Sequence, residues 1–153
     1  MTEMQLSFNG FSFIKQCEGC SLEAYQDVGG VWTIGYGWTN KVDGLSIKKG
    51  MVITQRTADN LLLNGLKAYV FGVNRLLKIN INQHQFDALV DFCYNIGIEA
   101  FSKSTLLHLV NDGCFSLAAE EFLKWSYVNG KKCAGLLNRR IKEQNLFLQI
   151  GNP

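Results

Sequence analysis

Proline, histidine and long apolar runs are all scarce in this 153-residue chain. The one proline is residue 153, so no predicted helix ahead of it is interrupted by a proline ring. No window holds about 18 uninterrupted apolar residues, the length that a membrane-spanning helix needs. No basic run resembles the stretches that follow a nucleic-acid backbone. We therefore expect no stable membrane insertion and no nucleic-acid partner.

The first ten residues lack the positively charged leader and apolar stretch of a signal peptide. Five cysteines, an odd number, cannot all pair within one chain, which fits a reducing compartment. We expect the chain to be made and folded in the cytoplasm.

The composition indicates one domain with a substantial core. Apolar residues make up 47% of the chain, and 15 basic residues against 13 acidic ones give a net charge of +2. This length is too short for two ordinary independent domains, although one domain can have two lobes. The small positive charge permits an acidic polymer as a partner without requiring one.

The pattern predicts a mainly helical α+β fold with its only sheet near the N-terminus. A helix is expected over residues 8–18, ended by Gly19, with one buried stripe formed by Phe8, Phe11, Ile14 and Cys17. Residues 22–37 are rich in β-forming residues around Gly29-Gly30 and predict a β-hairpin followed by another extended segment.

The rest of the chain predicts helices. Thr54 is the expected N-cap of a long helix over residues 57–78, and Asn82 with Gln85 resembles a capping box for a helix that Gly97 closes. Further helices are expected around residues 103–111, 116–125 and 135–149. Asp112-Gly113 and Asn129-Gly130 are interpreted as turns between them.

Candidate catalytic residues are concentrated between positions 18 and 39. Glu18 is expected at a helix C-terminus, where the helix dipole and apolar neighbours disfavour ionisation of its carboxyl. A carboxyl that can donate a proton suits glycosidic cleavage. If Asp27 and Thr33 face each other across the hairpin, they can hold a water between a carboxylate and a hydroxyl.

This segment resembles the phage-type lysozyme family, glycoside hydrolase family 24. The family motif falls on Glu18, Asp27, Thr33 and the residues Ile34-Gly35-Tyr36-Gly37. The resemblance extends over residues 11 to 151. It includes Gln85-Phe86-Asp87-Ala88-Leu89-Val90, Tyr94-Asn95-Ile96-Gly97, Ser104-Thr105-Leu106-Leu107 and Gly135-Leu136 with Arg139-Arg140 and Glu143.

The resemblance implies a two-lobed lysozyme-like fold and a muramidase. The expected parts are an N-terminal lobe over about 12–56, a linking helix over about 57–80, and a helical lobe of 81–153 with 1–11. The implied reaction is hydrolysis of the β-1,4 bond between N-acetylmuramic acid and N-acetylglucosamine in bacterial peptidoglycan, with no cofactor. Glu18 is implied as proton donor, and Asp27 with Thr33 as the residues that position and activate water.

Water attack on the face opposite the acid implies inversion. A separation of roughly 6.5 to 9.5 Å between the two carboxyls fits inversion, whereas about 5 to 5.5 Å fits a covalent intermediate and retention. Asp27 as a base, rather than a purely electrostatic stabiliser, is a hypothesis.

The resemblance also implies roles for three further positions. By resemblance, Tyr94 lines the sugar groove, Ser104 touches substrate, and Arg139, more readily than Arg140, holds the Glu18 side chain. The alternatives are a packed ring for Tyr94, an N-cap for Ser104 and an exposed, unpaired arginine.

The clearest departure from the family pattern is Trp38, where many members have histidine. An indole can pack but cannot accept a proton, so we expect altered stability or groove shape with catalysis intact.

Cys17 and Cys20 bracket the proposed acid and raise two other interpretations. A redox Cys-x-x-Cys motif should stand at the start of a helix that follows a strand, whereas Cys17 and Cys20 are expected at the end of a helix. Zinc needs further ligands, and His84, His108, Cys93 and Cys114 lack suitable spacing. Buried or incidental thiols are the favoured interpretation. A regulatory disulfide involving Cys17 or Cys20 after export is the remaining alternative.

Two non-enzymatic functions compete with the lysozyme interpretation. A catalytically weak or inactive glycan-binding module would have lost the acid, yet the acid is present. The second non-enzymatic function is that of an interaction protein built on the same scaffold. The resemblance also implies a monomer that waits in the host cytoplasm and depends on a holin or another release route to reach the wall during phage-induced lysis.

Overall fold

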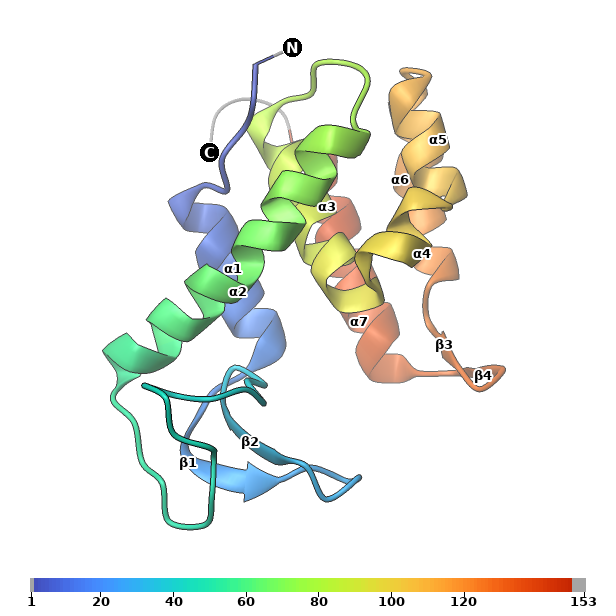
Figure 1. Ribbon diagram of the computed structural model, residues 1–153. Coiled ribbons are helices and arrows are strands. Elements are labelled where there is room, and N and C mark those ends of the chain that lie inside the picture. Colours follow the sequence, from blue (N-terminus) through green and yellow to red (C-terminus); the bar gives the residue numbers. More distant parts are fainter. Residues whose placement is uncertain (1, 150–153) are drawn as a thin grey trace. The chain divides into compact units, whose positions relative to one another are not determined.

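Helices dominate the fold, and two small antiparallel hairpins complete it (Figure 1). The computed structural model describes residues 2–149. The helices are α1 (Phe8–Glu18), α2 (Gln55–Leu76), α3 (Gln83–Ile96), α4 (Ile98–Ser102), α5 (Thr105–Asn111), α6 (Phe115–Glu121), the 3₁₀ turn η1 (Phe122–Lys124) and α7 (Ala134–Phe147). The strands are β1 (Ser21–Gln26), β2 (Trp32–Gly35), β3 (Tyr127–Val128) and β4 (Lys131–Lys132). The predicted α+β class is confirmed.

The chain divides into two compact units. One unit is Ser12–Lys67, and the other combines the described residues of Met1–Phe11 and Ala68–Pro153. The division falls within α1 and within α2, so each of these helices contributes residues to both units. The division into an N-terminal lobe, a linking helix and a helical lobe stays a prediction.

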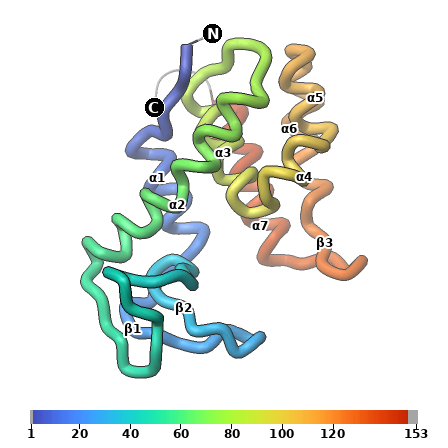
Figure 2. Tube along the Cα trace, viewed as in Figure 1, coloured from blue at the N-terminus to red at the C-terminus, as the bar shows by residue number. Residues whose placement is uncertain are grey.

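The unit Ser12–Lys67 is built around the hairpin β1–β2. Tyr25 pairs with Thr33 and Gln26 with Trp32, with an irregular register between Ser21 and Tyr25. The connection from β2 to α2 is a long loop without helix (Figure 2). Among its buried side chains, Val42 and Ile47 join Ile34 of β2 in a small apolar core. This core fixes the hairpin within its unit.

The other unit is organised around α3, which is buried along most of its length. Asn82 and Gln85 form the predicted capping box, and Gly97 caps the other end of the helix. The Phe92 ring makes edge-to-face contacts with Phe101, Phe122 and Trp125 at centroid distances of 5.2 to 6.2 Å. Such geometry is favourable for aromatic rings in a core.

The N-terminal segment is tied to α3 by hydrogen bonds. The Ser7 backbone N–H and hydroxyl both donate to the Asp87 carboxylate, and the same hydroxyl accepts from the Gly10 N–H. Asn74 exchanges hydrogen bonds with the Met4 backbone. Asp87 is 1% exposed, so these donors compensate the cost of burying its carboxylate.

Several predicted elements are confirmed with small boundary differences. Helix α1 ends at Glu18, and Gly19 takes a left-handed φ of 70°, as a C-terminal glycine should. The Thr54 hydroxyl accepts the Thr57 N–H and caps α2, which begins two residues earlier than predicted. The helices predicted around 116–125 and 135–149 correspond to α6 with η1 and to α7. Pro153 lies outside the described residues.

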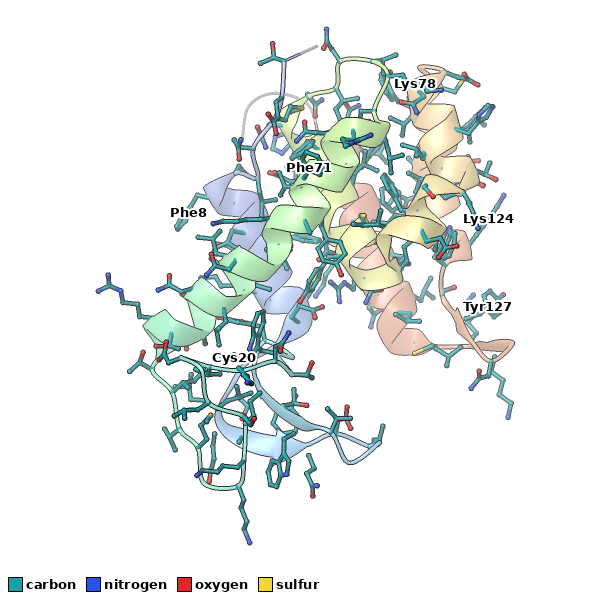
Figure 3. The ribbon with its side chains drawn as sticks, viewed as in Figure 1. Phe8, Cys20, Phe71, Lys78, Lys124 and Tyr127 are labelled. Carbon is teal, nitrogen blue, oxygen red and sulfur yellow. The ribbon has the colours of Figure 1, made fainter. Side chains whose placement is uncertain are left out.

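Two predictions were wrong. Phe8 is 81% exposed and does not join a buried stripe with Ile14 (Figure 3). The hairpin β1–β2 is not the only sheet, because Asn129 and Gly130, both at positive φ, turn β3 back onto β4. Positive φ at both turn positions is the geometry of a two-residue hairpin. The helix predicted around residues 103–111 is confirmed as α5, which begins two residues later than predicted and follows the short helix α4.

Candidate active site

Glu18 is the last residue of α1. The Gly19 N–H donates to the Lys15 carbonyl at 3.0 Å, and the left-handed backbone at Gly19 then leads the chain into β1 at Ser21. The Glu18 side chain is half-buried. The predicted acid therefore stands at the junction of the helix and the hairpin.

Asp27 follows β1 and organises the hairpin turn. Its Oδ1 accepts hydrogen bonds from the N–H groups of Gly29 and Val31, both at 2.9 Å. Its backbone N–H donates to the Val31 carbonyl, and its carbonyl accepts from the Gly30 N–H. Within residues 2–149, Oδ2 makes no hydrogen bond, and the side chain is exposed. The turn thus orients the carboxylate while leaving one oxygen open to solvent.

Thr33 lies in β2 and is 4% exposed. Its hydroxyl donates to the Val31 carbonyl at 2.9 Å. Thr33 pairs with Tyr25, and Asp27 is in register with Val31, so Asp27 and Thr33 are diagonal neighbours. The expectation that they stand directly opposite each other is wrong. Because residues two apart on a strand share a face, the two side chains still belong to the same face of the hairpin.

The segment Ile34-Gly35-Tyr36-Gly37 forms a tight reversal after Thr33. Gly35 and Gly37 have φ values of 65° and 77°, which favour glycine. The reversal pairs Ile34 with Trp38 through two hydrogen bonds of 2.9 Å. The Trp38 ring packs against the apolar core of this unit, and its Nε1 donates to the Lys41 carbonyl at 3.1 Å. Trp38 therefore has a packing role.

Tyr36 connects this reversal to α2 through a polar cluster that the sequence did not indicate. Its hydroxyl donates to Asp59 Oδ1 at 2.9 Å, and the Gln55 amide donates to both groups at 2.9 Å. Lys15 of α1 forms an ion pair with Asp59 at 3.6 Å. The cluster joins α1, the reversal and α2 inside one unit. Tyr36 lies in the family motif, but no local pattern connects it with a carboxylate 23 residues later.

The cluster shifts the ionisation of two of its members. Burial, the hydrogen bond to Asp59 and the charge of Asp59 raise the pKa of Tyr36 to about 12. Burial alone would raise the pKa of Asp59, but hydrogen bonds from Gln55 and Tyr36 and the charge of Lys15 outweigh it and lower that pKa below its usual value. Tyr36 stays a neutral donor and Asp59 stays ionised.

The predicted substrate contacts, Tyr94 and Ser104, lie in the other unit. Tyr94 is half-buried on α3, with its ring edge-to-face against Tyr69 at 5.0 Å. Ser104 is the N-cap of α5: its hydroxyl accepts from the Leu107 N–H and donates to the Phe101 carbonyl. The packed ring and the N-cap are therefore confirmed. Contact with substrate stays a prediction at both positions.

Arg139 is held by a two-point ion pair with Asp91. Its Nη2 and Nε reach the two Asp91 oxygens at 2.7 and 3.1 Å, and its side chain is only 10% exposed. The alternative of an exposed arginine without a partner is therefore wrong. That Arg139 holds Glu18 stays a prediction.

Arg140 and Glu143 complete a buried charged cluster around Asp91. Arg140 is 0% exposed, stacks over Phe92 at 5.0 Å, donates to Asn95 and lies 3.1 Å from Glu143. Burial, a hydrogen bond to Asp91 and the charge of Asp91 raise the pKa of Glu143 well above its usual range, against the opposing charges of the two arginines. The sequence placed these residues in the family pattern but did not indicate that Asp91 joins them.

The described residues give no support to a metal or redox centre. Among residues 2–149, no group of three or more histidine, cysteine, aspartate or glutamate side chains is placed to hold a metal ion. The five cysteines are all thiols; Cys93 is buried, and Cys20 and Cys114 are exposed. No helix in this range is both long and apolar enough to cross a bilayer.

Comparison with known proteins places the chain in one family. The phage lysozyme family model matches residues 15–143, a range that includes Glu18, Asp27 and Thr33. The chain is 44% identical to the endolysin of Bacillus phage PZA, over 98% of this chain and 57% of that protein. It is 42% identical to the endolysin of Salmonella phage P22, over 95% of this chain and 99% of that protein. The chain thus spans little more than half of the first relative and nearly all of the second.

Solved structures agree with the sequence matches. A crystal structure of a P22 lysozyme variant superposes with a TM-score of 0.89 at 40% identity, covering 95% of this chain and 99% of that one. The muramidase domain of SpmX from Asticaccaulis excentricus superposes with a TM-score of 0.85 at 40% identity and the same coverage. The predicted family resemblance is confirmed: the chain belongs to the phage lysozyme family.

Proposed function

We propose that this chain is a lysozyme that hydrolyses the β-1,4 bond between N-acetylmuramic acid and N-acetylglucosamine in bacterial peptidoglycan. Family membership supports this proposal, as do the names of the relatives, an endolysin in phage P22 and a muramidase domain in SpmX. No metal or cofactor enters the proposed reaction.

In this proposal Glu18 donates a proton to the leaving glycosidic oxygen. Asp27 and Thr33 bind the attacking water, and Asp27 accepts its proton as the new bond to the sugar forms. The oxygen of water is transferred to the muramic acid carbon, and the proton from Glu18 leaves with the other sugar. Acid and base catalysis of this kind contribute about 10²–10⁴-fold each.

The observation that carries the proposal is the way the turn holds Asp27. Two backbone N–H groups fix Oδ1, and Oδ2 is open on the face of the hairpin that Thr33 shares. A carboxylate held by backbone donors is pre-organised to bind a water and needs no rearrangement before reaction.

Inversion follows if water attacks opposite the acid. The first-formed product would then have the α configuration at the new reducing end. Proton NMR during the first minutes of digestion distinguishes it from the β-anomer, and an initial β-anomer would contradict inversion and the role of Asp27 as a base.

The roles of Tyr94, Ser104 and Arg139 are part of the same proposal. Tyr94 and Ser104 would bind the saccharide chain, and Arg139 would orient Glu18. Substitution of Tyr94 or Ser104 should raise KM with a smaller change in kcat. Substitution of Arg139 should lower kcat, because Glu18 would no longer be oriented.

Clearing of a purified peptidoglycan suspension tests the proposed activity. Glu18→Gln should lose at least about 10²-fold of the wild-type rate while keeping its circular dichroism spectrum and melting temperature. Glu23→Gln is the matched control, because Glu23 is an exposed carboxylate on β1 of the same unit. A wild-type protein inactive on every peptidoglycan tested would favour a glycan-binding or interaction role instead.

We also infer that the protein acts during phage-induced lysis. It would be a monomer that waits in the host cytoplasm until a holin or another route gives access to the wall. Expression should leave cells intact until the membrane is permeabilised. Lysis of intact cells without permeabilisation would contradict this route.

A further inference from the structure

Two adjoining hollows lie in the unit that contains α3. Neither is lined by Glu18, Asp27 or Thr33, and among the other proposed site residues only Ser104 lines one of them, the polar hollow. The first is an apolar groove of about 420 Å³ between α2 and α4. The second is a polar hollow of about 470 Å³ beside α5. Leu76 and Ser102 line both, so the two lie next to each other. Each has the volume of an ordinary ligand site.

The groove is lined mainly by apolar side chains that are open to solvent. Its lining side chains are apolar except for Arg75 and Ser102, and Phe71 is 56% exposed along its wall (Figure 3). Gly72 lies where α2 passes close to Ile98, since a Cβ at this position would lie 3.3 Å from the Ile98 side chain. The guanidinium of Arg75 lies 5.6 Å from the centre of the Phe71 ring. The groove therefore has an apolar lining, with the Arg75 guanidinium beside it.

The hollow next to the groove is lined by basic side chains. Its charged or titratable lining side chains are Lys78, Lys103 and His108, and no carboxylate lines it. Hydroxyls of Ser102 and Thr105 add donors. Lysine ammonium groups and hydroxyls are typical ligands of phosphate and carboxylate head groups.

The basic groups differ in their availability. Lys103 pairs with Glu99 at 3.0 Å and His108 with Asp112 at 3.2 Å, and all four side chains are largely exposed. The Lys78 backbone N–H is fixed by Asn111 at 2.8 Å, and no residue within 2–149 pairs with its ammonium. Exposed ion pairs contribute about 0–1 kcal/mol each, so an anion can compete for Lys103 as well as bind Lys78.

We propose that this composite site binds one anionic single-chain amphiphile, with its alkyl chain in the groove and its phosphate or carboxylate head group in the hollow. An inorganic anion would leave the groove empty, and a neutral hydrocarbon would leave Lys78 without a partner. The proposal does not depend on glycan hydrolysis, and its test does not measure that activity.

Isothermal titration calorimetry with alkyl phosphates below their critical micelle concentrations tests the site. Dodecyl phosphate should bind with one-to-one stoichiometry. Octyl phosphate, shorter by four methylenes, should bind at least about tenfold more weakly, because each buried methylene strengthens binding by up to about fourfold. Dodecyltrimethylammonium and inorganic phosphate should show no saturable binding in the same concentration range.

Paired variants locate the binding. Lys78→Glu should weaken dodecyl phosphate binding at least about fivefold, and Phe71→Ala should reduce the difference between dodecyl and octyl phosphate. The matched controls are Lys131→Glu on β4 and Leu117→Ala on α6, an exposed lysine and a 55%-exposed apolar residue outside the site. Both controls should bind as the wild type does. Unchanged melting temperatures show that each variant is folded.

Several results would overturn the proposal. They are absence of saturable binding, equal binding of the cationic amphiphile, inorganic phosphate binding as tightly as dodecyl phosphate, and binding unaffected by both site variants. Binding only to phosphatidylglycerol vesicles, with none to monomeric dodecyl phosphate, would also overturn it, because it would indicate a membrane surface rather than a single bound chain.

Discussion

Asp27 and Thr33 are connected through one residue, Val31. The Val31 N–H donates to Asp27 Oδ1 at 2.9 Å, and the Thr33 hydroxyl donates to the Val31 carbonyl at 2.9 Å. The Asp27 N–H donates to the same carbonyl. Replacing Thr33 therefore leaves the Val31 carbonyl bonded to the Asp27 N–H, and Asp27→Asn keeps a side-chain oxygen for the Val31 N–H, so these two changes can remove the chemistry without unfolding the turn.

Replacing Thr33 by valine tests this separation. The Val31 carbonyl would keep its bond from Asp27, so we expect a loss of only about 0.5–1.5 kcal/mol in the free energy of unfolding. Peptidoglycan clearing should fall by about 10²-fold, because the hydroxyl that positions water is gone. Thr33→Ser, which keeps the hydroxyl, should recover most of the rate. Equal activity of the valine and serine variants would remove Thr33 from the mechanism.

Tyr36→Phe should destabilise the unit that contains the hairpin. The change removes a hydroxyl that donates to an ionised carboxylate and accepts from Gln55, at a cost of about 1–3 kcal/mol. Thermal or urea unfolding measures the difference. Tyr127→Phe is the control, since Tyr127 is 57% exposed and should change stability little. If both variants were equally stable, the polar cluster would not hold the reversal to α2.

Glu143→Gln should change how stability depends on pH. The folded-state pKa of Glu143 is raised, so the unfolded chain ionises this carboxyl at lower pH than the folded protein does. Its favourable contribution is therefore fully present below the unfolded-state value and is lost as pH rises through the folded-state value. Glutamine mimics only the neutral carboxyl, so the variant should gain stability relative to the wild type as pH rises.

Urea unfolding of both proteins between pH 4 and pH 9 measures this trend. The control Glu120→Gln alters an exposed carboxyl on α6 and should follow the wild type at every pH. A pH-independent difference between wild type and Glu143→Gln would show that the carboxyl does not change its proton affinity on folding.

The cysteines should differ in reactivity according to burial. Burial raises the pKa of Cys93 to about 12, so its thiolate is rare near neutral pH, and its side chain is 0% exposed. Cys20 and Cys114 are exposed. Ellman's reagent followed by peptide mass mapping should label Cys20 and Cys114 in the native protein and Cys93 only after unfolding. Rapid native labelling of Cys93 would contradict its burial.

Local signals in the sequence predicted the parts of the fold that local chemistry determines. The Asn82–Gln85 capping box, the Thr54 cap and the Gly19 helix end depend on neighbouring residues, and each was predicted. The β3–β4 hairpin was missed because Asn129-Gly130 was interpreted as a turn between helices. Its strands have only two residues each, too few for an alternating pattern to be visible.

The site was predictable as a motif but not as a network. Asp27 and Thr33 were identified from their spacing, whereas their diagonal register depends on how the turn closes through Val31. The pairs Tyr36–Asp59 and Asp91–Arg139 join residues 23 and 48 positions apart. Packing of whole elements brings such residues together, and a single sequence has no local signal for that.

End-group analysis of digested peptidoglycan in ¹⁸O-labelled water tests the central claim most directly. The account predicts muropeptides with a reducing N-acetylmuramic acid end that carries one solvent-derived ¹⁸O at the new hydroxyl, measured by mass spectrometry after rapid borohydride reduction. It predicts that Glu18→Gln and Asp27→Asn proteins, folded as the wild type is, form this product at least about 10²-fold more slowly. Anhydro-muramic ends without label, or unchanged product formation by either variant, would contradict it.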